Sequence, residues 1–102
     1  MESTYETFMG RLGKNPELKY TKEGKPVCDL SIAINKGKDV PPHWRKVVVW
    51  EKQAELCSLY LKKGYEVFVQ GRAEMKAFKT NEGGTKTYEE VNARLVGFTN
   101  LN

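Results

Sequence analysis

The chain has 102 residues, a length that supports one domain with a single core. A charged fraction of 29% and a hydrophobic fraction of 39% are typical of a globular protein and exclude a disordered one. The net charge of +4, from 17 basic and 13 acidic residues, permits a polyanionic partner but lacks the excess of a histone-like arm.

Strand patterns dominate the first part of the chain. A first strand is expected over Tyr5–Leu12, and the turn-forming segment Gly13–Pro16 interrupts it. Apolar residues at every second position then predict a strand over Val27–Asn35. A polar loop, Lys36–Pro42, follows that strand and leads to the next one.

Both tryptophans lie in the third predicted strand, Trp44-Arg45-Lys46-Val47-Val48-Val49-Trp50. Side chains alternate along a strand, so Trp44, Lys46 and Trp50 share the face of Val48, and Val47 and Val49 can enter a core. A nucleobase can stack on an indole while Lys46 neutralises a phosphate. The alternative is that one or both indoles fill the core, the commonest use of a lone Trp. A Lys buried between them would need a partner, which favours the exposed arrangement.

A helix is predicted over Lys52–Lys63. Lys62 and Lys63 suit the negative end of its dipole, and Gly64 is a natural C-terminal stop.

Two strands joined by a hairpin turn at Asn81–Gly84 end the chain. The first is expected over Tyr65–Phe78, where Gly71 predicts a bend or bulge, and the second over Thr85–Val96. The inward positions of the first are Val67, Val69, Gly71, Ala73 and Met75, and its outward positions include Arg72, Lys76 and Phe78.

Five strands with one helix between the third and fourth predict an all-β fold, the OB-fold, a partly open Greek-key barrel, in a single domain over residues 1–102. Strands two and three, with the loops joining strands one to two and four to five, form the binding surface of this fold. The expected contacts to a single-stranded nucleic acid combine aromatic with basic residues, as such a track requires. They are Trp44, Trp50, Phe78, Lys38, Lys46, Arg72, Lys76 and Lys79. For any one of the lysines, an ordinary solvated surface is the competing interpretation.

Other kinds of site have weaker support. No apolar run approaches the roughly 20 residues of a membrane span, and Met1–Glu6 lacks a signal-peptide core, so we expect a cytoplasmic protein with no membrane partner. Cys28 and Cys57 are too few and too far apart for a disulfide framework, and we expect both to be buried. His43 alone offers no metal-site spacing, so no metal or cofactor is expected.

An enzyme is the hypothesis from another class. His43 lies in a proline-flanked loop without an evident nucleophile, and no carboxylate pair stands out. Gly83-Gly84-Thr85-Lys86-Thr87 lacks the spacing of a phosphate loop and leads into a strand, so we expect no catalysis. An OB module that binds only proteins is a third possibility, which quenching of tryptophan fluorescence by single-stranded DNA would distinguish.

The sequence also resembles a known family, the bacterial-type single-stranded DNA-binding proteins, from about Tyr5 to Phe98. The resemblance is carried by Gly10–Tyr20, Trp44–Trp50, Ala54-Glu55 followed by Tyr60–Gly64, and Gly71-Arg72, with Glu90-Val91 completing the pattern. It implies that Trp44, Trp50 and Phe78 are base-stacking positions. It also implies a nucleoid-associated homo-oligomer, with a tetramer favoured and a dimer possible, which acts in DNA replication, recombination and repair.

The sequence departs from that family at two points. Lys38 stands where a further stacking aromatic is often found, which removes a platform worth about 1–3 kcal/mol. Family members generally end in a tail with an acidic tip that recruits replication and repair proteins, whereas this sequence has no Asp after Asp39 and ends at Asn102. Either a tail has been trimmed away or partner recruitment is absent. The second case would resemble the tail-less primosomal protein of replication restart, a dimeric OB relative that binds single strands and helper proteins.

Overall fold

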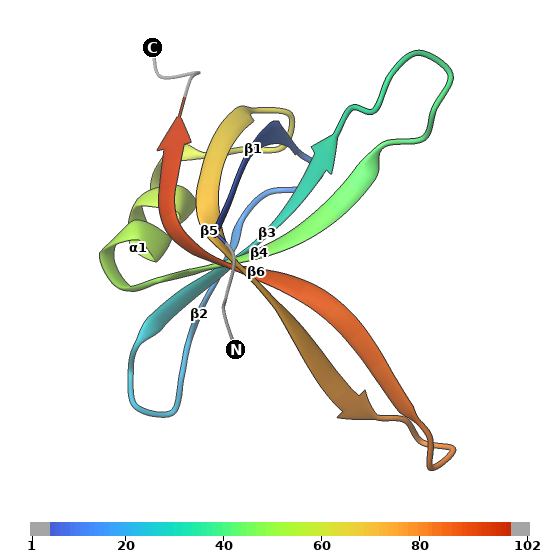
Figure 1. Ribbon diagram of the computed structural model, residues 1–102. Coiled ribbons are helices and arrows are strands. Elements are labelled where there is room, and N and C mark those ends of the chain that lie inside the picture. The colour runs from blue at the N-terminus through green and yellow to red at the C-terminus, as the bar shows by residue number, and fades with distance from the viewer. Residues whose placement is uncertain (1–4, 99–102) are drawn as a thin grey trace.

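Six strands and one helix follow one another along residues 5–98, the part of the chain that the computed structural model describes (Figure 1). They are β1 (Tyr5–Leu12), β2 (Glu17–Tyr20), β3 (Pro26–Ile34), β4 (His43–Trp50), α1 (Glu51–Tyr60), β5 (Glu66–Lys79) and β6 (Thr85–Phe98). Apart from β2, the elements lie where the sequence predicts them, with small shifts at their ends.

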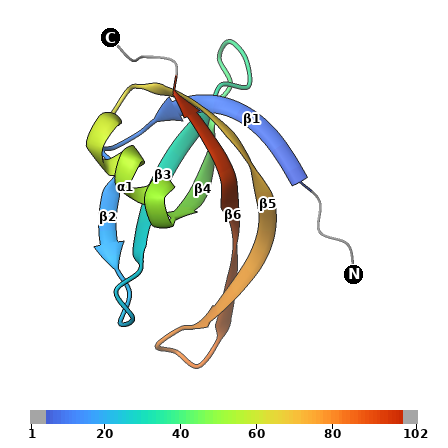
Figure 2. The same cartoon turned by 90° about the vertical axis from the view of Figure 1, so that its left-hand side faces the viewer.

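The barrel contains five of these strands, in the order β1-β5-β6-β4-β3, and closes because β1 pairs with both β5 and β3. Neighbouring strands are antiparallel except β4 and β6, which pair in parallel only at Val47–Val91 and Val48–Asn92. The helix α1 packs against β3 and joins the third barrel strand to the fourth (Figure 2). This is the predicted OB-fold.

The strand β2 was not predicted from the sequence. It pairs with the edge of β3 from Glu17↔Asp29 to Tyr20↔Pro26, outside the closed ring. Leu18 is the only aliphatic residue in its four positions, so the segment has no apolar alternation by which a strand could be recognised.

Apolar side chains from the barrel strands, from α1 and from Leu61 just after it fill the interior. The buried set is Leu12, Cys28, Leu30, Ile32, Val47, Val49, Ala54, Cys57, Leu61, Val67, Val69 and Val91. The inward position predicted for Met75 is wrong, because this side chain is 66% exposed. By that point β5 has left the barrel and forms with β6 the long hairpin that projects from it in both views (Figures 1 and 2).

The predicted helix end at Lys63 is also wrong, since α1 stops at Tyr60. Leu61 has an extended backbone and its side chain is buried in the core. The helix therefore ends before Leu61, because that extended conformation is what brings the side chain into the core. Lys62 and Lys63 therefore lie beyond the last helical turn. Gly64 takes a positive φ of 91° in the turn that leads to β5. Within residues 5–98 the helix is too short and too polar to cross a bilayer.

The predicted irregularity at Gly71 is confirmed. The register of β5 with β6 shifts between Gln70 and Gly71, which pair with Leu95 and Ala93 and leave Arg94 as the extra residue of a β-bulge. A Cβ atom on Gly71 would lie 2.5 Å from the carbonyl oxygen of Asn92, so the close approach of the two strands requires glycine here.

Cys28 and Cys57 are free and buried, as expected. Burial raises the pKa of Cys28 to about 11 and that of Cys57 to about 12, so almost no thiolate forms near pH 8. We expect Ellman's reagent to modify both thiols only when the barrel opens, far more slowly than in denaturant. Fast modification of either thiol in the folded protein would contradict this packing.

Candidate nucleic-acid interface

The outer face of the barrel carries most of the aromatic and basic residues singled out from the sequence. Trp44, Lys46 and Trp50 alternate along β4 on the side opposite the buried Val47 and Val49. Trp44 is 53% exposed and Trp50 is 37% exposed, so neither indole is a core residue. Val48 shares their face but is buried where β4 lies between β3 and β6.

The indole of Trp44 lies against Gly13, in the turn after β1. The Gly13 amide donates a hydrogen bond to the Ser31 carbonyl oxygen over 2.9 Å, which holds the turn beside β3. A Cβ atom on Gly13 would lie 2.3 Å from Cζ3 of Trp44, so only a residue without a side chain leaves the indole in this position. The absence of a side chain at Gly13 therefore leaves the space that the proposed stacking ring of Trp44 occupies.

Replacing Gly13 with alanine should displace the Trp44 indole without unfolding the barrel, because the obstructing atoms belong to an exposed side chain that can rotate. We expect the affinity for single-stranded DNA to fall by part of the ~1–3 kcal/mol of one stacked base. Fluorescence titration of Gly13→Ala beside Trp44→Ala tests this. In the variant that carries both substitutions, Gly13→Ala should cause no loss of affinity beyond that of Trp44→Ala. Losses that add would show that Gly13 does not act by positioning the Trp44 ring.

Beside Trp44 the surface is hollowed over a volume of about 520 Å³. Its wall includes Ser31, Trp44, Lys46 and Tyr88, from β3, β4 and β6. Tyr88 was not among the residues predicted from the sequence. The sequence offered one indication that Tyr88 belongs to the site. Its position in the last strand places it opposite Lys76 when the two strands pair as a hairpin.

Tyr88 links the aromatic residues of two strands. Its ring centroid lies 5.9 Å from that of Phe78, which is 49% exposed on β5. The Nζ atom of Lys46 lies 5.0 Å from the Tyr88 ring centroid. Trp44, Tyr88 and Phe78, together with Trp50 on β4, are called the aromatic strip below. These rings offer π surfaces of the kind on which bases stack.

The lysines near the aromatic strip are paired with carboxylates, which the sequence did not indicate. Lys46 Nζ lies 3.3 Å from Glu90 Oε2, and Lys76 Nζ lies 3.2 Å from Glu74 Oε1. The hydrogen bond with Glu74 raises the pKa of Lys76. Any phosphate that approaches Lys46 or Lys76 must therefore compete with a neighbouring carboxylate for the ammonium group.

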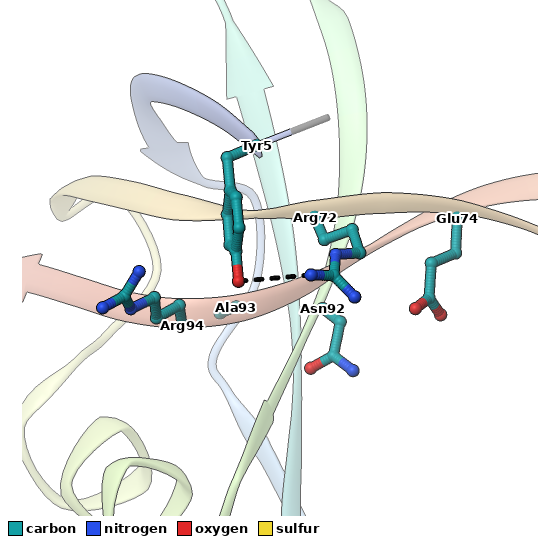
Figure 3. A pocket seen from close by; sticks show the side chains of 6 residues that line it. All are labelled: Tyr5, Arg72, Glu74, Asn92, Ala93 and Arg94. Atoms are coloured by element: carbon teal, nitrogen blue, oxygen red, sulfur yellow. Dashed lines mark hydrogen bonds between the residues drawn. The ribbon is translucent and has the colours of Figure 1, made fainter. Parts of the chain in front are cut away.

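The remaining basic residues that the sequence predicted as DNA contacts lie away from Trp44 and Tyr88. Lys79 ends β5, in register with Thr85 beside the hairpin turn. Lys38 lies in the β3–β4 loop, which projects from the opposite end of the barrel to the β5–β6 hairpin (Figures 1 and 2). Arg72 lies on β5 beside β1, where one of its terminal nitrogens is 3.4 Å from the Tyr5 hydroxyl (Figure 3).

Arg45 points to the inside of the barrel and has a structural role. Its guanidinium donates hydrogen bonds to both carboxylate oxygens of Glu6 over 3.0 and 3.2 Å and lies 3.0 Å from Glu89 Oε1. It also lies 4.9 Å from the centroid of the Phe8 ring. The hydrogen bonds from Arg45 lower the pKa of Glu6. Arg45, Glu6, Phe8 and Glu89 together are called the Arg45 clasp.

Comparison with known proteins agrees with this geometry. Residues 6–99 match the family described as "Single-strand binding protein family". The chain is similar to "Single-stranded DNA-binding protein 1" of Synechocystis sp., with 36% identity over 82% of this chain and 72% of that protein. It is also similar to the "Single-stranded DNA-binding protein" of Halalkalibacterium halodurans, with 38% identity over 89% of this chain and 57% of that protein. A similar protein of Chlorobaculum tepidum is 36% identical over 79% of this chain and 54% of its own length, so the chain spans only about half the length of some relatives.

Proposed function

This chain belongs to the single-strand binding protein family, and from that membership and the outer barrel face we propose that it binds single-stranded DNA independently of sequence. Bases stack on Trp44, Trp50 and Phe78, and Tyr88 extends this surface. Basic side chains, including Lys46, Arg72 and Lys76, contact phosphates. The observation that carries the proposal is the exposure of three large aromatic rings along one face of an OB-fold. Lys79 and Lys38 make further contacts at opposite ends of the barrel.

The biological role that we propose is protection of single strands during DNA replication, recombination and repair. In this proposal residues 1–102 form one OB-fold domain, which acts as a homo-oligomer, with a tetramer favoured over a dimer, in the cytoplasm near the nucleoid. Replication and repair proteins are the proposed partners. No catalytic activity is proposed, because the outer face is suited to stacking and to charge neutralisation.

A direct binding measurement tests the proposal. Fluorescence anisotropy of labelled poly-dT should report tight binding, and a duplex of mixed sequence should bind much more weakly because its bases cannot stack on protein. Mixed-sequence single strands should bind with similar affinity, since phosphate contacts carry no sequence information. Preference for the duplex would overturn the proposal, and light scattering of the same samples gives the oligomeric state.

Because Lys46 and Glu90 form an ion pair, we predict that replacing one of them weakens binding to poly-dT and that replacing the other strengthens it. Lys46→Gln should weaken poly-dT binding and reduce the slope of log affinity against log salt by about 0.7, the value of one phosphate contact on a single strand. Glu90→Gln releases Lys46 from its carboxylate and removes a negative charge from the face. It should therefore strengthen binding at low salt.

Anisotropy titrations of both variants over a series of salt concentrations check this prediction. Lys52→Gln is the matched control, because that exposed lysine lies on α1. If Lys46→Gln and Glu90→Gln both leave the slope at its wild-type value, then Lys46 does not contact a phosphate.

A further inference from the structure

The turn between β1 and β2 brings a further lysine to the hollow beside Trp44. Lys14 is exposed and lies in the wall of that hollow, and its neighbour Gly13 leaves the space that the Trp44 ring occupies. An ammonium group and a stacking ring therefore line one hollow, although they come from segments far apart in the chain.

Lys14 differs in its pairing from the other cations of the hollow. Four basic and three acidic side chains line its wall. Three of the basic ones, Lys19, Arg45 and Lys46, each lie within 3.7 Å of a carboxylate oxygen. In the part of the chain that the structure describes, residues 5–98, the Lys14 side chain forms no ion pair and no hydrogen bond. A phosphate can thus reach Lys14 without displacing a carboxylate.

Hydrogen bonds on both sides of Lys14 fix the backbone of this turn. On one side, the Gly13 amide donates to the Ser31 carbonyl oxygen over 2.9 Å. On the other side, the Lys63 amide donates to Asn15 Oδ1 over 2.8 Å, which ties the turn to the segment after α1. Because the backbone that carries the ammonium group is already held in place, binding of a phosphate restricts only the Lys14 side chain.

We propose that Lys14 binds the phosphate beside the base that stacks on Trp44. This inference rests on the proposed function and adds a contact residue that sequence analysis did not single out. A phosphate bound at Lys14 exchanges only water and small ions for the ammonium group, whereas one bound at Lys19 must also compete with Asp29. Lys14 should therefore contribute more to affinity than Lys19, although both side chains are exposed in the same hollow.

The first test compares Lys14→Gln with Lys19→Gln, because these two lysines share a hollow and differ in pairing. Binding to oligo-dT of about 16 nucleotides, the upper range for one OB-fold, is measured over a salt series. We expect Lys14→Gln to lower the affinity roughly tenfold at low salt, from one charge-assisted contact. The slope of log affinity against log salt should fall by about 0.7. Lys19→Gln should lower the affinity much less, and Lys14→Arg, which keeps the charge, should bind like the wild type.

The second test asks whether the phosphate lies beside Trp44. In Trp44→Ala the nucleotide next to the turn is no longer held by stacking, so adding Lys14→Gln should cause a smaller loss of affinity than it causes in the wild type. Trp50 lies at the other end of β4, so adding Lys14→Gln to Trp50→Ala should cause the full loss.

Three results would overturn the contact. A wild-type affinity and slope in Lys14→Gln would show that no phosphate is bound at this residue. An equal loss in Lys19→Gln would show that the absence of a carboxylate partner does not single out Lys14. Equal effects of Lys14→Gln in Trp44→Ala and in Trp50→Ala would show that the phosphate does not lie beside Trp44. Wild-type protein that fails to bind oligo-dT would reject the proposed function itself, which separates the two failures.

Discussion

Replacing Trp44 or Trp50 with alanine should weaken binding to single-stranded DNA by about 1–3 kcal/mol for each ring, the usual contribution of a stacked base. Six strand positions separate the backbones of Trp44 and Trp50 by roughly 20 Å, so the losses should add in the double variant. The fold should persist, because both indoles are exposed and the core lies on the opposite face of the strand. Anisotropy titration with poly-dT, beside thermal unfolding by circular dichroism, measures both effects.

Leu59→Ala is the matched control for this experiment, since Leu59 is a large apolar side chain that is 69% exposed on α1, outside the aromatic strip. Its affinity for poly-dT should equal that of the wild type. If the tryptophan variants lost thermal stability while each folded molecule kept its full affinity, the indoles would serve the fold and the stacking proposal would be lost.

Replacing Arg45 with methionine should lower the free energy of unfolding by about 1.5–3 kcal/mol, because the nearly buried guanidinium that donates to Glu6 and pairs with Glu89 is then lost. The midpoint of thermal unfolding should fall by roughly 4–8 °C for each kcal/mol. Arg11→Met, which removes only one exposed hydrogen bond to the Gly64 carbonyl, should cost much less. Equal losses in the two variants would contradict a stabilising role for the Arg45 clasp.

The Arg45 clasp also gives stability a defined dependence on pH. The pKa of Glu6 is lowered in the folded protein from its ordinary value of 4.5, so the unfolded chain binds more protons in this range. The stabilisation is therefore complete above about pH 4.5 and is lost as the pH falls through the lowered folded pKa. In Glu6→Gln the midpoint of thermal unfolding should therefore fall less steeply below pH 4.5 than in the wild type. Glu82→Gln, in the exposed β5–β6 turn, should leave this pH dependence unchanged.

The parts of the fold that sequence predicted are those with a strong local pattern. Alternation along Val27–Asn35 and the valines of β4 identified core strands, and Gly71 identified the bulge. The strand β2 has no such pattern and exists because the edge of β3 supplies its partners. The helix end was mistaken because burial of Leu61 in the core, a tertiary effect, outweighs the helix-stop signal of Gly64.

The site was predictable in its aromatic residues and much less so in its charges. The exposure of Trp44 and Trp50 follows from their face of β4, which a single strand reveals. Glu90, the partner of Lys46, and Glu89, one of the two carboxylate partners of Arg45, come from β6, more than forty positions along the chain, and their placement depends on the parallel pairing of β4 with β6.

The intrinsic fluorescence of wild-type protein titrated with oligo-dT tests the central claim most directly, because Trp44 and Trp50 are the only tryptophans of the chain. Stacking of bases on both rings predicts strong quenching that saturates together with the anisotropy of the labelled strand, while a duplex of equal length produces little change. Saturated binding of the single strand with unchanged tryptophan emission would contradict the account, since the bases would then lie elsewhere on the protein.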